Sequence, residues 1–415
     1  MEILNDSKQQ SSSRDFEYCS VREKSSMVEK AGKGKRVILI AIALDQNYGS
    51  EPGTGWLALK SHVLLGNYVT IITTPSVENN FKFDLTFSQS KVRFTTVDSK
   101  FLREIKQLPF FSDQIYSIFW NIKAKKVISN LIHLEKFDLI HHATYTGDWN
   151  YSAIHSIKTS IPRIWGPVGS ASRFSKKVVL NSRFKGFSKQ FIKLQIENMF
   201  RSELRKRAVK KNIKVFAQNI EIQNYFSEKI ECKLIPMIAL PHLKSSMRWN
   251  SPNSNYFFGS GRMIKFKNWT LTIEALRFLP DDYLLILTGD GPDLKRLKKY
   301  AKSSGLENRI IFTGHLTYEE CLNLLLRSKA FVFPSYGDSL GWSLGEAIHF
   351  GVPVISLATT ASETLTREIS TDLIKIGPKS AQNFALQMLN PTKHNGFNQF
   401  CLCRVLNEFE QLIDA

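Results

Sequence analysis

Acidic residues and long apolar runs are both scarce in this chain of 415 residues. The longest apolar run covers residues 37–44, far short of the roughly 20 residues that a membrane-spanning helix needs. The 37 Asp and Glu residues face 56 Lys and Arg residues, which gives a formal net charge of +19. This excess favours polyanionic partners such as nucleic acid, an anionic membrane or phosphorylated ligands, but charge by itself does not choose among them.

Cysteine is also rare, and the N-terminal residues contain no apolar stretch. The five cysteines are an odd number and form no CxxC pairs that would hold zinc, so we expect idle thiols in a reducing compartment. Residues 1–35 are polar and rich in Ser and Lys, unlike a signal peptide. We therefore expect a flexible tail there and a cytoplasmic protein with no transmembrane segment.

Short apolar runs alternate with amphipathic stretches along most of the chain, a pattern typical of βαβ units around a parallel sheet. The expected strands cover 37–44, 69–74, 92–97, 138–142, 163–165, 215–218, 256–259, 283–288, 309–313, 330–333 and 352–356. The expected helices include 55–65, 113–134, 270–279, 293–303, 317–327 and 344–350.

This alternation predicts two doubly wound α/β domains, whose ligands would bind at the carboxyl ends of the strands. Pro236, Pro241 and Pro252 interrupt the pattern and mark the seam between the domains. The predicted organisation is a tail over 1–35, an N-terminal domain over 36–240, a C-terminal domain over 241–390 and a C-terminal helix over 391–415, which we expect to cross back to the first domain.

The segment 333–346, FPSYGDSLGWSLGE, is the strongest functional signal. A buried strand is expected to end at its start, a glycine-containing loop follows, and a helix begins near Trp342. This geometry directs the backbone N–H groups of Gly341, Trp342 and Ser343 at a ligand in front of the helix, and a diphosphate suits that position. The absence of a Cβ at Gly341 also permits a close approach of the ligand.

Two carboxylates, Asp338 and Glu346, belong to the same segment. The first lies on the loop and the second inside the helix, so they would reach different parts of one extended ligand. Glu346, which only accepts hydrogen bonds, is suited to the two hydroxyls of a ribose. The competing interpretation is a helix N-terminus enriched in acids.

The segment resembles the E-x7-E region of the family-4 retaining glycosyltransferases, whose usual form is FPS-x-x-E-x-x-G-x-x-x-x-E-A-x-x-x-G-x-P-V-I. The chain departs from this form at Asp338, where the family has Glu, and the missing methylene withdraws the carboxylate by roughly 1.5 Å. That departure bears on sugar preference. The matching positions are Phe333, Pro334, Ser335, Gly341, Glu346, Ala347, Gly351, Pro353, Val354 and Ile355.

The resemblance implies a GT-B fold, in which two Rossmann-like doubly wound α/β domains face a central cleft. It also implies a nucleoside-diphosphate sugar as the donor substrate, no required cofactor or metal, and retention of anomeric configuration. Arg262 and Lys267 match the family element that holds the diphosphate, and two cations would offset the charge that develops on it. Lys265 is a nearby rival for the second cation.

Weaker signals lie on other expected loops. Asp290 and His315 follow two strands of the second domain and match family elements that border the nucleotide base, although each is also an ordinary turn. Gly53 and Gly55 belong to a glycine-rich link between the first strand and the first helix, which resembles a loop near the donor phosphates. His142 ends a strand where relatives keep a histidine against the donor sugar; a buried structural histidine is the alternative.

The stretch 173–214 carries fourteen Lys and Arg against Glu197 and Glu203, with five phenylalanines between them. This composition favours a segment that binds an anionic membrane surface. The alternative is a basic helix that is merely exposed to solvent. We find no nucleic-acid-binding motif and expect no nucleic-acid partner.

The resulting hypothesis is a cytoplasmic, peripherally membrane-associated glycosyltransferase of surface polysaccharide or glycolipid synthesis. It would act on a hydroxyl of a saccharide or lipid-linked acceptor. The proposed catalytic residues are Asp338, Arg262, Lys267 and His142. Two alternatives remain: a non-catalytic sugar-nucleotide or polyanion-binding module, and another GT-B activity such as an epimerase.

Overall fold

The computed structural model describes residues 34–45, 50–81, 91–107, 113–169, 187–240, 249, 254–369, 371–394 and 400–414. The described residues divide into two compact units. The first domain holds those before Leu240 together with the residues from Leu402 onward, and the second domain holds those from Leu240 to Cys401.

The first domain is built on a seven-stranded sheet in which all neighbouring strands are parallel. The order β3-β2-β1-β4-β5-β6-β7 reverses direction between β1 and β4, which makes the sheet doubly wound. The strands are β1 (Arg36–Ile40), β2 (Tyr68–Thr73), β3 (Val92–Thr96), β4 (Leu139–His142), β5 (Arg163–Val168), β6 (Lys214–Ala217) and β7 (Cys232–Leu234).

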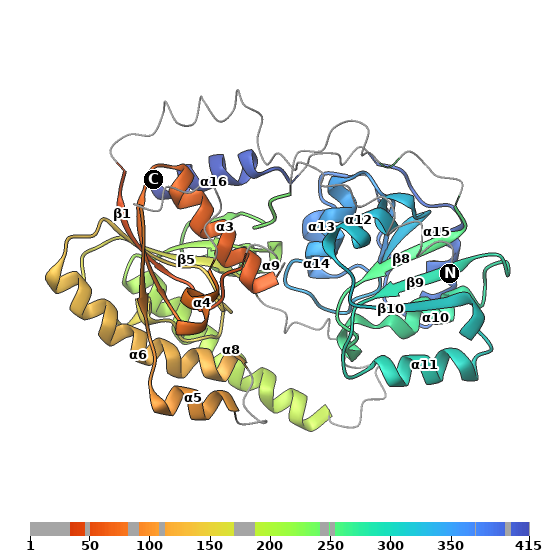
Figure 1. Cartoon of the computed structure of the whole chain (residues 1–415), viewed down its shortest axis with the longest axis horizontal. Helices are drawn as coiled ribbons and strands as arrows, with labels where there is room; N and C mark the ends of the chain where they lie inside the picture. Colours follow the sequence, from red (N-terminus) through yellow and green to blue (C-terminus); the bar gives the residue numbers. More distant parts are fainter. Residues whose placement is uncertain are drawn as a thin grey trace. The chain divides into compact units, whose positions relative to one another are not determined.

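Helices cover both faces of this sheet (Figure 1). They are α3 (Ser50–Leu64), α4 (Pro75–Asn80), α5 (Lys100–Gln107), α6 (Asp113–Leu134), the 3-10 helix η2 (Ala153–His155), α8 (Phe187–Lys210), α9 (Ile220–Ser227) and α16 (Leu402–Asp414).

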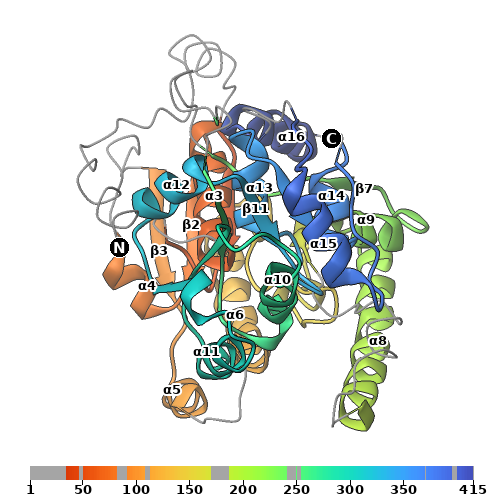
Figure 2. The ribbon, with the colours of Figure 1, turned by 90° about the vertical axis from the view of Figure 1, so that its right-hand side faces the viewer.

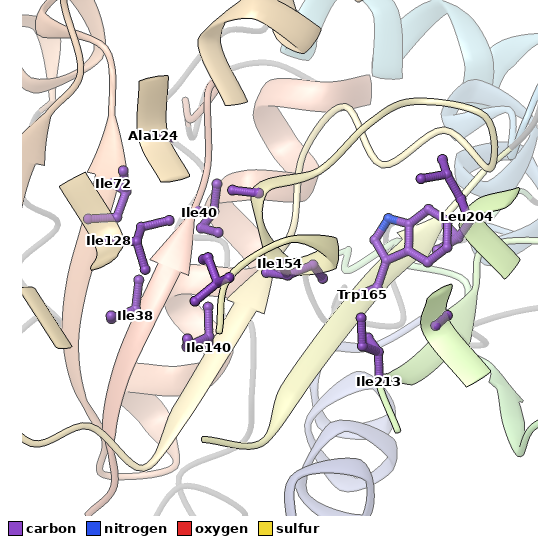
Figure 3. Packing of buried hydrophobic residues seen from close by; sticks show 14 of the residues in the cluster. Ile38, Ile40, Ile72, Ala124, Ile128, Ile140, Ile154, Trp165, Leu204 and Ile213 are labelled. Carbon is purple, nitrogen blue, oxygen red and sulfur yellow. The ribbon is translucent and has the colours of Figure 1, made fainter. Parts of the chain in front are cut away.

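Alternate strand residues feed two separate cores, as the period of two in a strand dictates. On one face, Ile38, Ile40 and Ile140 pack with Ile128 of α6 (Figure 3). On the other face, Leu39 and its neighbours pack with α3 and with the apolar side of α16. The C-terminal helix therefore completes the core of the first domain.

The second domain repeats this plan with five parallel strands in the order β10-β9-β8-β11-β12. The strands are β8 (Tyr256–Ser260), β9 (Leu284–Thr288), β10 (Ile310–Gly314), β11 (Ala330–Phe333) and β12 (Val354–Ser356). The helices are η4 (Lys265–Lys267), α10 (Trp269–Leu276), α11 (Leu294–Ser303), η5 (Glu307–Arg309), α12 (Tyr318–Arg327), α13 (Trp342–His349), α14 (Thr360–Leu365) and α15 (Ser380–Leu389).

The predicted α/β class and the doubly wound sheets are confirmed, and two local differences have clear causes. The first strand ends at Ile40 rather than at residue 44, because the Ile42 N–H donates to the Thr144 hydroxyl (2.8 Å) and leaves the ladder. The three-residue strand β7 is too short to give a periodic signal. Cys232, Cys321 and Cys401 are free thiols, as expected.

A directed hydrogen-bond chain crosses the core of the first domain. The carbonyl of Gly166 can only accept, so His141 Nε2–H donates a hydrogen bond to it (2.8 Å). His141 Nδ1 must then accept from His62 Nε2 (3.0 Å). By the same logic His62 Nδ1 accepts from the Asn67 amide (3.3 Å), whose oxygen accepts from the Lys35 backbone (2.9 Å).

This chain requires neutral imidazoles. Burial holds the pKa of His62 well below its usual value and lowers that of His141 to about 4. Burial likewise lowers the pKa of His142 and of His155 to about 3 each. In the unfolded chain these groups would bind a proton near pH 6.5, so acid favours the unfolded state.

We predict that the first domain loses stability as the pH falls from about 6.5 towards 4, by about 1.4 kcal/mol per pH unit for each buried histidine that the unfolded chain protonates. Hydrogen exchange of peptides from β1 and β4, corrected for intrinsic rates, measures this opening free energy. Peptides from β8 and β11 report on the second domain, where the lowered pKa of His394 and the raised pKa of Glu346 act in opposite directions, so these peptides should show a smaller slope. Equal pH slopes in both sets would refute the neutral histidine chain.

Candidate functional site

The carboxyl ends of β8 and β11 meet at the point where the strand order of the second sheet reverses. Ligands of doubly wound sheets bind outside such switch points. Three loops emerge at this edge, namely 261–264 after β8, 289–293 after β9 and 334–341 after β11. The predicted residues Arg262, Asp290 and Asp338 lie on these loops.

Gly341 forms the turn between the β11 loop and α13. Its φ of 78° is left-handed, which favours glycine, and a Cβ there would lie 2.9 Å from Cζ of the Phe333 ring. The Ser343 hydroxyl donates to the Ser260 carbonyl (3.2 Å) and ties the first turn of α13 to the end of β8. By helix geometry, the amides of Trp342 and Ser343 have no carbonyl four residues earlier within the helix, so they are available to an anion.

Trp342 contributes an apolar ring and one unsatisfied donor. Its indole Nε1 is buried and has no hydrogen-bond partner among the residues that the structure describes. A buried donor of this kind is costly unless a ligand or water accepts from it.

Lys267 and Asp338 form a close ion pair across two loops. The Lys267 ammonium lies 3.0 and 2.9 Å from the two carboxylate oxygens of Asp338. Their side chains are 13% and 22% exposed, so solvent weakens this pair less than it weakens a surface pair. The ammonium also lies 5.3 Å from the centroid of the Phe333 ring, which adds a cation–π contact.

Glu346 lies one turn inside α13 and is partly buried. Burial raises the pKa of its carboxyl to about 7, so ionising this carboxyl costs more free energy in the folded protein than in water. The Cys321 thiol of α12 lies close enough to interact electrostatically with this carboxylate, and it also forms a hydrogen bond with Thr288. Burial, with a smaller contribution from Glu346, raises the pKa of Cys321 to about 11, which keeps the thiol protonated.

Backbone contacts fix the β8 and β9 loops against each other. Gly261 N–H donates to the Thr288 carbonyl (3.1 Å), and Met263 N–H donates to the Asp290 carbonyl (2.8 Å). A Cβ on Gly289 would lie 2.2 Å from the Gly261 carbonyl oxygen. Only glycine allows this approach, which explains the glycines of a loop that sequence alone could not distinguish from an ordinary turn.

The remaining predicted residues of this domain are exposed at the same edge. Arg262 and His315 are exposed, as is Asp290, whose Oδ1 accepts from Gly291 N–H (2.6 Å). The Trp269 indole donates to the Arg262 carbonyl (3.2 Å) and holds the backbone of Arg262, which leaves its guanidinium exposed. The rival Lys265 is also exposed.

The helix expected over 55–65 begins earlier, so Gly53 does not lie in a loop as predicted, and Gly55 lies inside the helix and not at its start. Helix α3 begins at Ser50, so both glycines are helical and buried. A Cβ on Gly55 would lie 2.1 Å from the Ala43 carbonyl oxygen, so this glycine permits close packing of α3 on the end of β1. The helix can begin early because Pro52 is tolerated in a first turn. The phosphate-binding role of both glycines stays a prediction.

His142 is fully buried at the end of β4, with no hydrogen-bond partner for either ring nitrogen in the described residues. His155 of η2 is near enough to lower its pKa electrostatically. His155 itself packs edge-on against Trp165, with ring centroids 4.4 Å apart. This environment favours the structural alternative for His142, and its contact with a donor sugar stays a prediction.

One acid of the first domain, Glu51, has a role that its sequence context did not define. It lies in the first turn of α3 and accepts a hydrogen bond from the Tyr145 N–H (2.8 Å), and burial raises its pKa. It thereby fixes the loop after β4. In the same loop Asp148 pairs with Arg201 of α8, and both side chains are buried. One arginine of the basic stretch is therefore a structural anchor.

We predict that Glu346→Gln stabilises the second domain by up to about 3 kcal/mol at pH 8, because a neutral amide avoids the cost of ionising a carboxyl whose pKa is raised from 4.5 to about 7. The gain should shrink as the pH falls through 7 and vanish below about pH 3.5, where the carboxyl is protonated in both the folded and the unfolded state. Calorimetric unfolding at pH 8 and pH 5 tests this fall in the gain. Glu307→Gln, at an exposed carboxylate of the same domain, is the control and should change neither melting curve.

Comparison with known proteins agrees with this geometry. Residues 245–388 match the family model of glycosyl transferases group 1. The 2-deoxystreptamine N-acetyl-D-glucosaminyltransferase of Niallia circulans is 31% identical over 99 residues, which cover 23% of this chain and 25% of that protein. The lipopolysaccharide core biosynthesis glycosyltransferase LpsD of Rhizobium meliloti is 32% identical over 29% of this chain and 34% of its own length. The chain thus spans about a quarter to a third of these relatives.

Solved structures match far more of the chain. The crystal structure of Anabaena Alr3699/HepE in complex with UDP and glucose aligns with a TM-score of 0.57 at 14% identity, over 92% of this chain and all of that one. WaaG, a glycosyltransferase involved in lipopolysaccharide biosynthesis, aligns with a TM-score of 0.54 at 14% identity, over 91% and 92% of the two chains. The match to the glycosyl transferases group 1 model thus lies in the second domain, and the chain as a whole has the GT-B fold.

Proposed function

We propose that this protein is a glycosyltransferase that moves a sugar from a nucleoside-diphosphate sugar to a hydroxyl group. The observation that carries the proposal is the arrangement of two cations, Arg262 and Lys267, and the first turn of α13 at the switch point of a group 1 domain. A diphosphate needs this combination of positive charge and backbone N–H groups.

The donor would lie along the carboxyl edge of the second sheet. Its diphosphate would contact the amides of Trp342 and Ser343, and Glu346 would accept hydrogen bonds from the ribose hydroxyls. Asp290 and His315 would border the base. The Anabaena protein was crystallised in complex with UDP, and UDP-sugars are accordingly the first donors to test.

In the reaction, the bond between the sugar carbon and the diphosphate oxygen breaks, and the acceptor oxygen bonds to the same carbon. Charge grows on the leaving diphosphate, where Arg262, Lys267 and the helix amides stabilise it. We propose that the leaving phosphate takes the proton of the acceptor hydroxyl, with retention at the sugar carbon. The resemblance to family-4 retaining enzymes supports retention, and the anomeric configuration of the product tests it.

We predict that Arg262→Ala and Glu346→Ala each reduce donor turnover by about a hundredfold or more, since each removes a charged contact to the donor. Release of nucleoside diphosphate from a panel of UDP-, GDP-, ADP- and TDP-sugars is the measurement. Arg277→Ala, at an exposed arginine after α10, is the matched control and should keep wild-type turnover.

Wild-type turnover in both active-site variants would refute the site. Nucleotide binding by the wild-type chain without any release of diphosphate, even with saccharide and lipid-linked acceptors supplied, would favour the non-catalytic binding module instead. Conversion of one sugar nucleotide into another would favour an epimerase.

We further propose that the acceptor belongs to a surface polysaccharide or glycolipid and that the protein docks on an anionic membrane to reach it. Helices α5, α6 and α8 pack their buried sides into one core cluster of the first domain, and Figures 1 and 2 show them on one side of its sheet. The outward sides form what we call the α5–α6–α8 surface. Its exposed residues include Phe101, Ile122, Met199, Phe200 and Val209 together with Lys100, Arg103, Lys106, Lys123, Lys126, Lys206 and Lys210.

Apolar side chains among lysines and arginines suit a lipid headgroup layer, which accepts both. No described helix is long and apolar enough to cross a bilayer. The predicted basic stretch overlaps this surface only in part, because its residues 173–186 lie outside the described part of the chain.

We predict that the protein sediments with vesicles of phosphatidylglycerol and phosphatidylcholine but not with phosphatidylcholine alone, and that the double change Lys206→Glu and Lys210→Glu weakens this binding by about tenfold or more. The control carries the same charge change on α11, as Lys295→Glu and Lys299→Glu, both exposed in the second domain. Equal loss in the two double variants would show that net charge, and not the α5–α6–α8 surface, drives binding.

A further inference from the structure

The Lys267 ammonium has three N–H donors and two potential anionic partners. In the structure it contacts both carboxylate oxygens of Asp338, at 3.0 and 2.9 Å. The proposed donor brings a diphosphate that requires the same ammonium. One cation would therefore have two anionic partners. The diphosphate cannot gain full contact with the Lys267 ammonium unless Asp338 loses part of its contact with it.

The surroundings of Lys267 restrict where its ammonium can go. The stem of the side chain runs beside Gly261, where a Cβ would lie 3.4 Å from Lys267 Cε. The ammonium lies over the Phe333 ring, and its side chain is 13% exposed. Asn268 follows in a left-handed conformation. Its side-chain amide donates a hydrogen bond to the Pro334 carbonyl (3.3 Å), which holds the turn against the β11 loop. The ammonium is thus confined beside the carboxylate.

Arg262, in contrast, is exposed on the neighbouring loop, and the structure gives it no acidic partner among the described residues. The two cations therefore differ: Arg262 offers its full charge to an anion, whereas Asp338 neutralises Lys267.

We propose that Asp338 competes with the diphosphate of the nucleotide for Lys267, and that this competition weakens diphosphate binding and speeds its release after transfer. The inference rests on the proposed function and assigns to Asp338 a positioning role exerted through Lys267. A carboxylate near a bound diphosphate weakens diphosphate binding in two ways: it pairs with the cation that the diphosphate needs, and it repels the diphosphate directly. The experiment must separate these two effects.

The test measures the dissociation constants of UDP and of inorganic pyrophosphate by calorimetry, for the wild-type chain and for Asp338→Asn. The amide keeps the shape and removes the charge, so both ligands should bind about tenfold tighter. Asp338→Glu keeps the negative charge and should bind both ligands with nearly wild-type affinity. Asp281→Asn, at a fully exposed carboxylate on the same domain, is the control and should leave binding unchanged.

Lys267→Met decides between the two effects. If Asp338 acts through Lys267, then adding Asp338→Asn to Lys267→Met should give little further tightening, which a double-mutant cycle reveals as coupling. An undiminished tenfold gain in that background would mean direct repulsion alone and would overturn the proposed route. In turnover assays Asp338→Asn should lower KM and kcat together, because the product diphosphate leaves more slowly.

The outcomes also separate this inference from the function on which it rests. A wild-type chain that binds UDP while Asp338→Asn binds it equally well or more weakly would overturn the competition and leave the glycosyltransferase proposal standing. A wild-type chain that binds neither UDP, GDP, ADP, TDP nor pyrophosphate would overturn both.

Discussion

The loops at the carboxyl edge of the second sheet approach one another more closely than side chains would permit. A Cβ on Gly289 would lie 2.2 Å from the Gly261 carbonyl oxygen, and a Cβ on Gly341 would lie 2.9 Å from the Phe333 ring. This approach brings the end of β8, the β9 loop and the first turn of α13 into one rigid backbone frame. The charged side chains of the site are presented from that frame, so their positions depend on it.

Charge is handled differently in the two domains. In the second domain the charge of Glu346 opposes folding, because burial raises the pKa of its carboxyl to about 7. Such a cost is common where a ligand is to supply the missing partner. The first domain also buries a carboxyl with a raised pKa, that of Glu51, and in addition it buries neutral histidines, whose directed hydrogen bonds link the residue before β1 with α3, β4 and β5. The buried hydrogen-bonded groups of the first domain thus hold its sheet and helices together.

Periodicity and turn residues predicted most strands and helices, because each apolar run is buried within a sheet or against one of its faces. The limits of α6 were predicted to the residue. Prediction was wrong where a long-range contact overrode the local pattern, since the hydrogen bond to Thr144 ends β1 early. It was also wrong for part of the glycine-rich link, where α3 begins at Ser50 and Gly55 permits its close packing against Ala43. The proximity of Cys321 to Glu346 had no sequence signal, because two separate helices create it.

The sequence by itself determined the α/β class and the order of motifs from Arg262 to Ile355, because glycine, proline and acid positions in a strand–loop–helix unit are local properties of the chain. Only the tertiary structure decided which charges meet. Lys267 and Asp338 are 71 residues apart and become partners because β8 and β11 are neighbours in the sheet. His141 and His142 are adjacent in sequence but serve opposite faces, because a strand directs successive side chains to opposite sides.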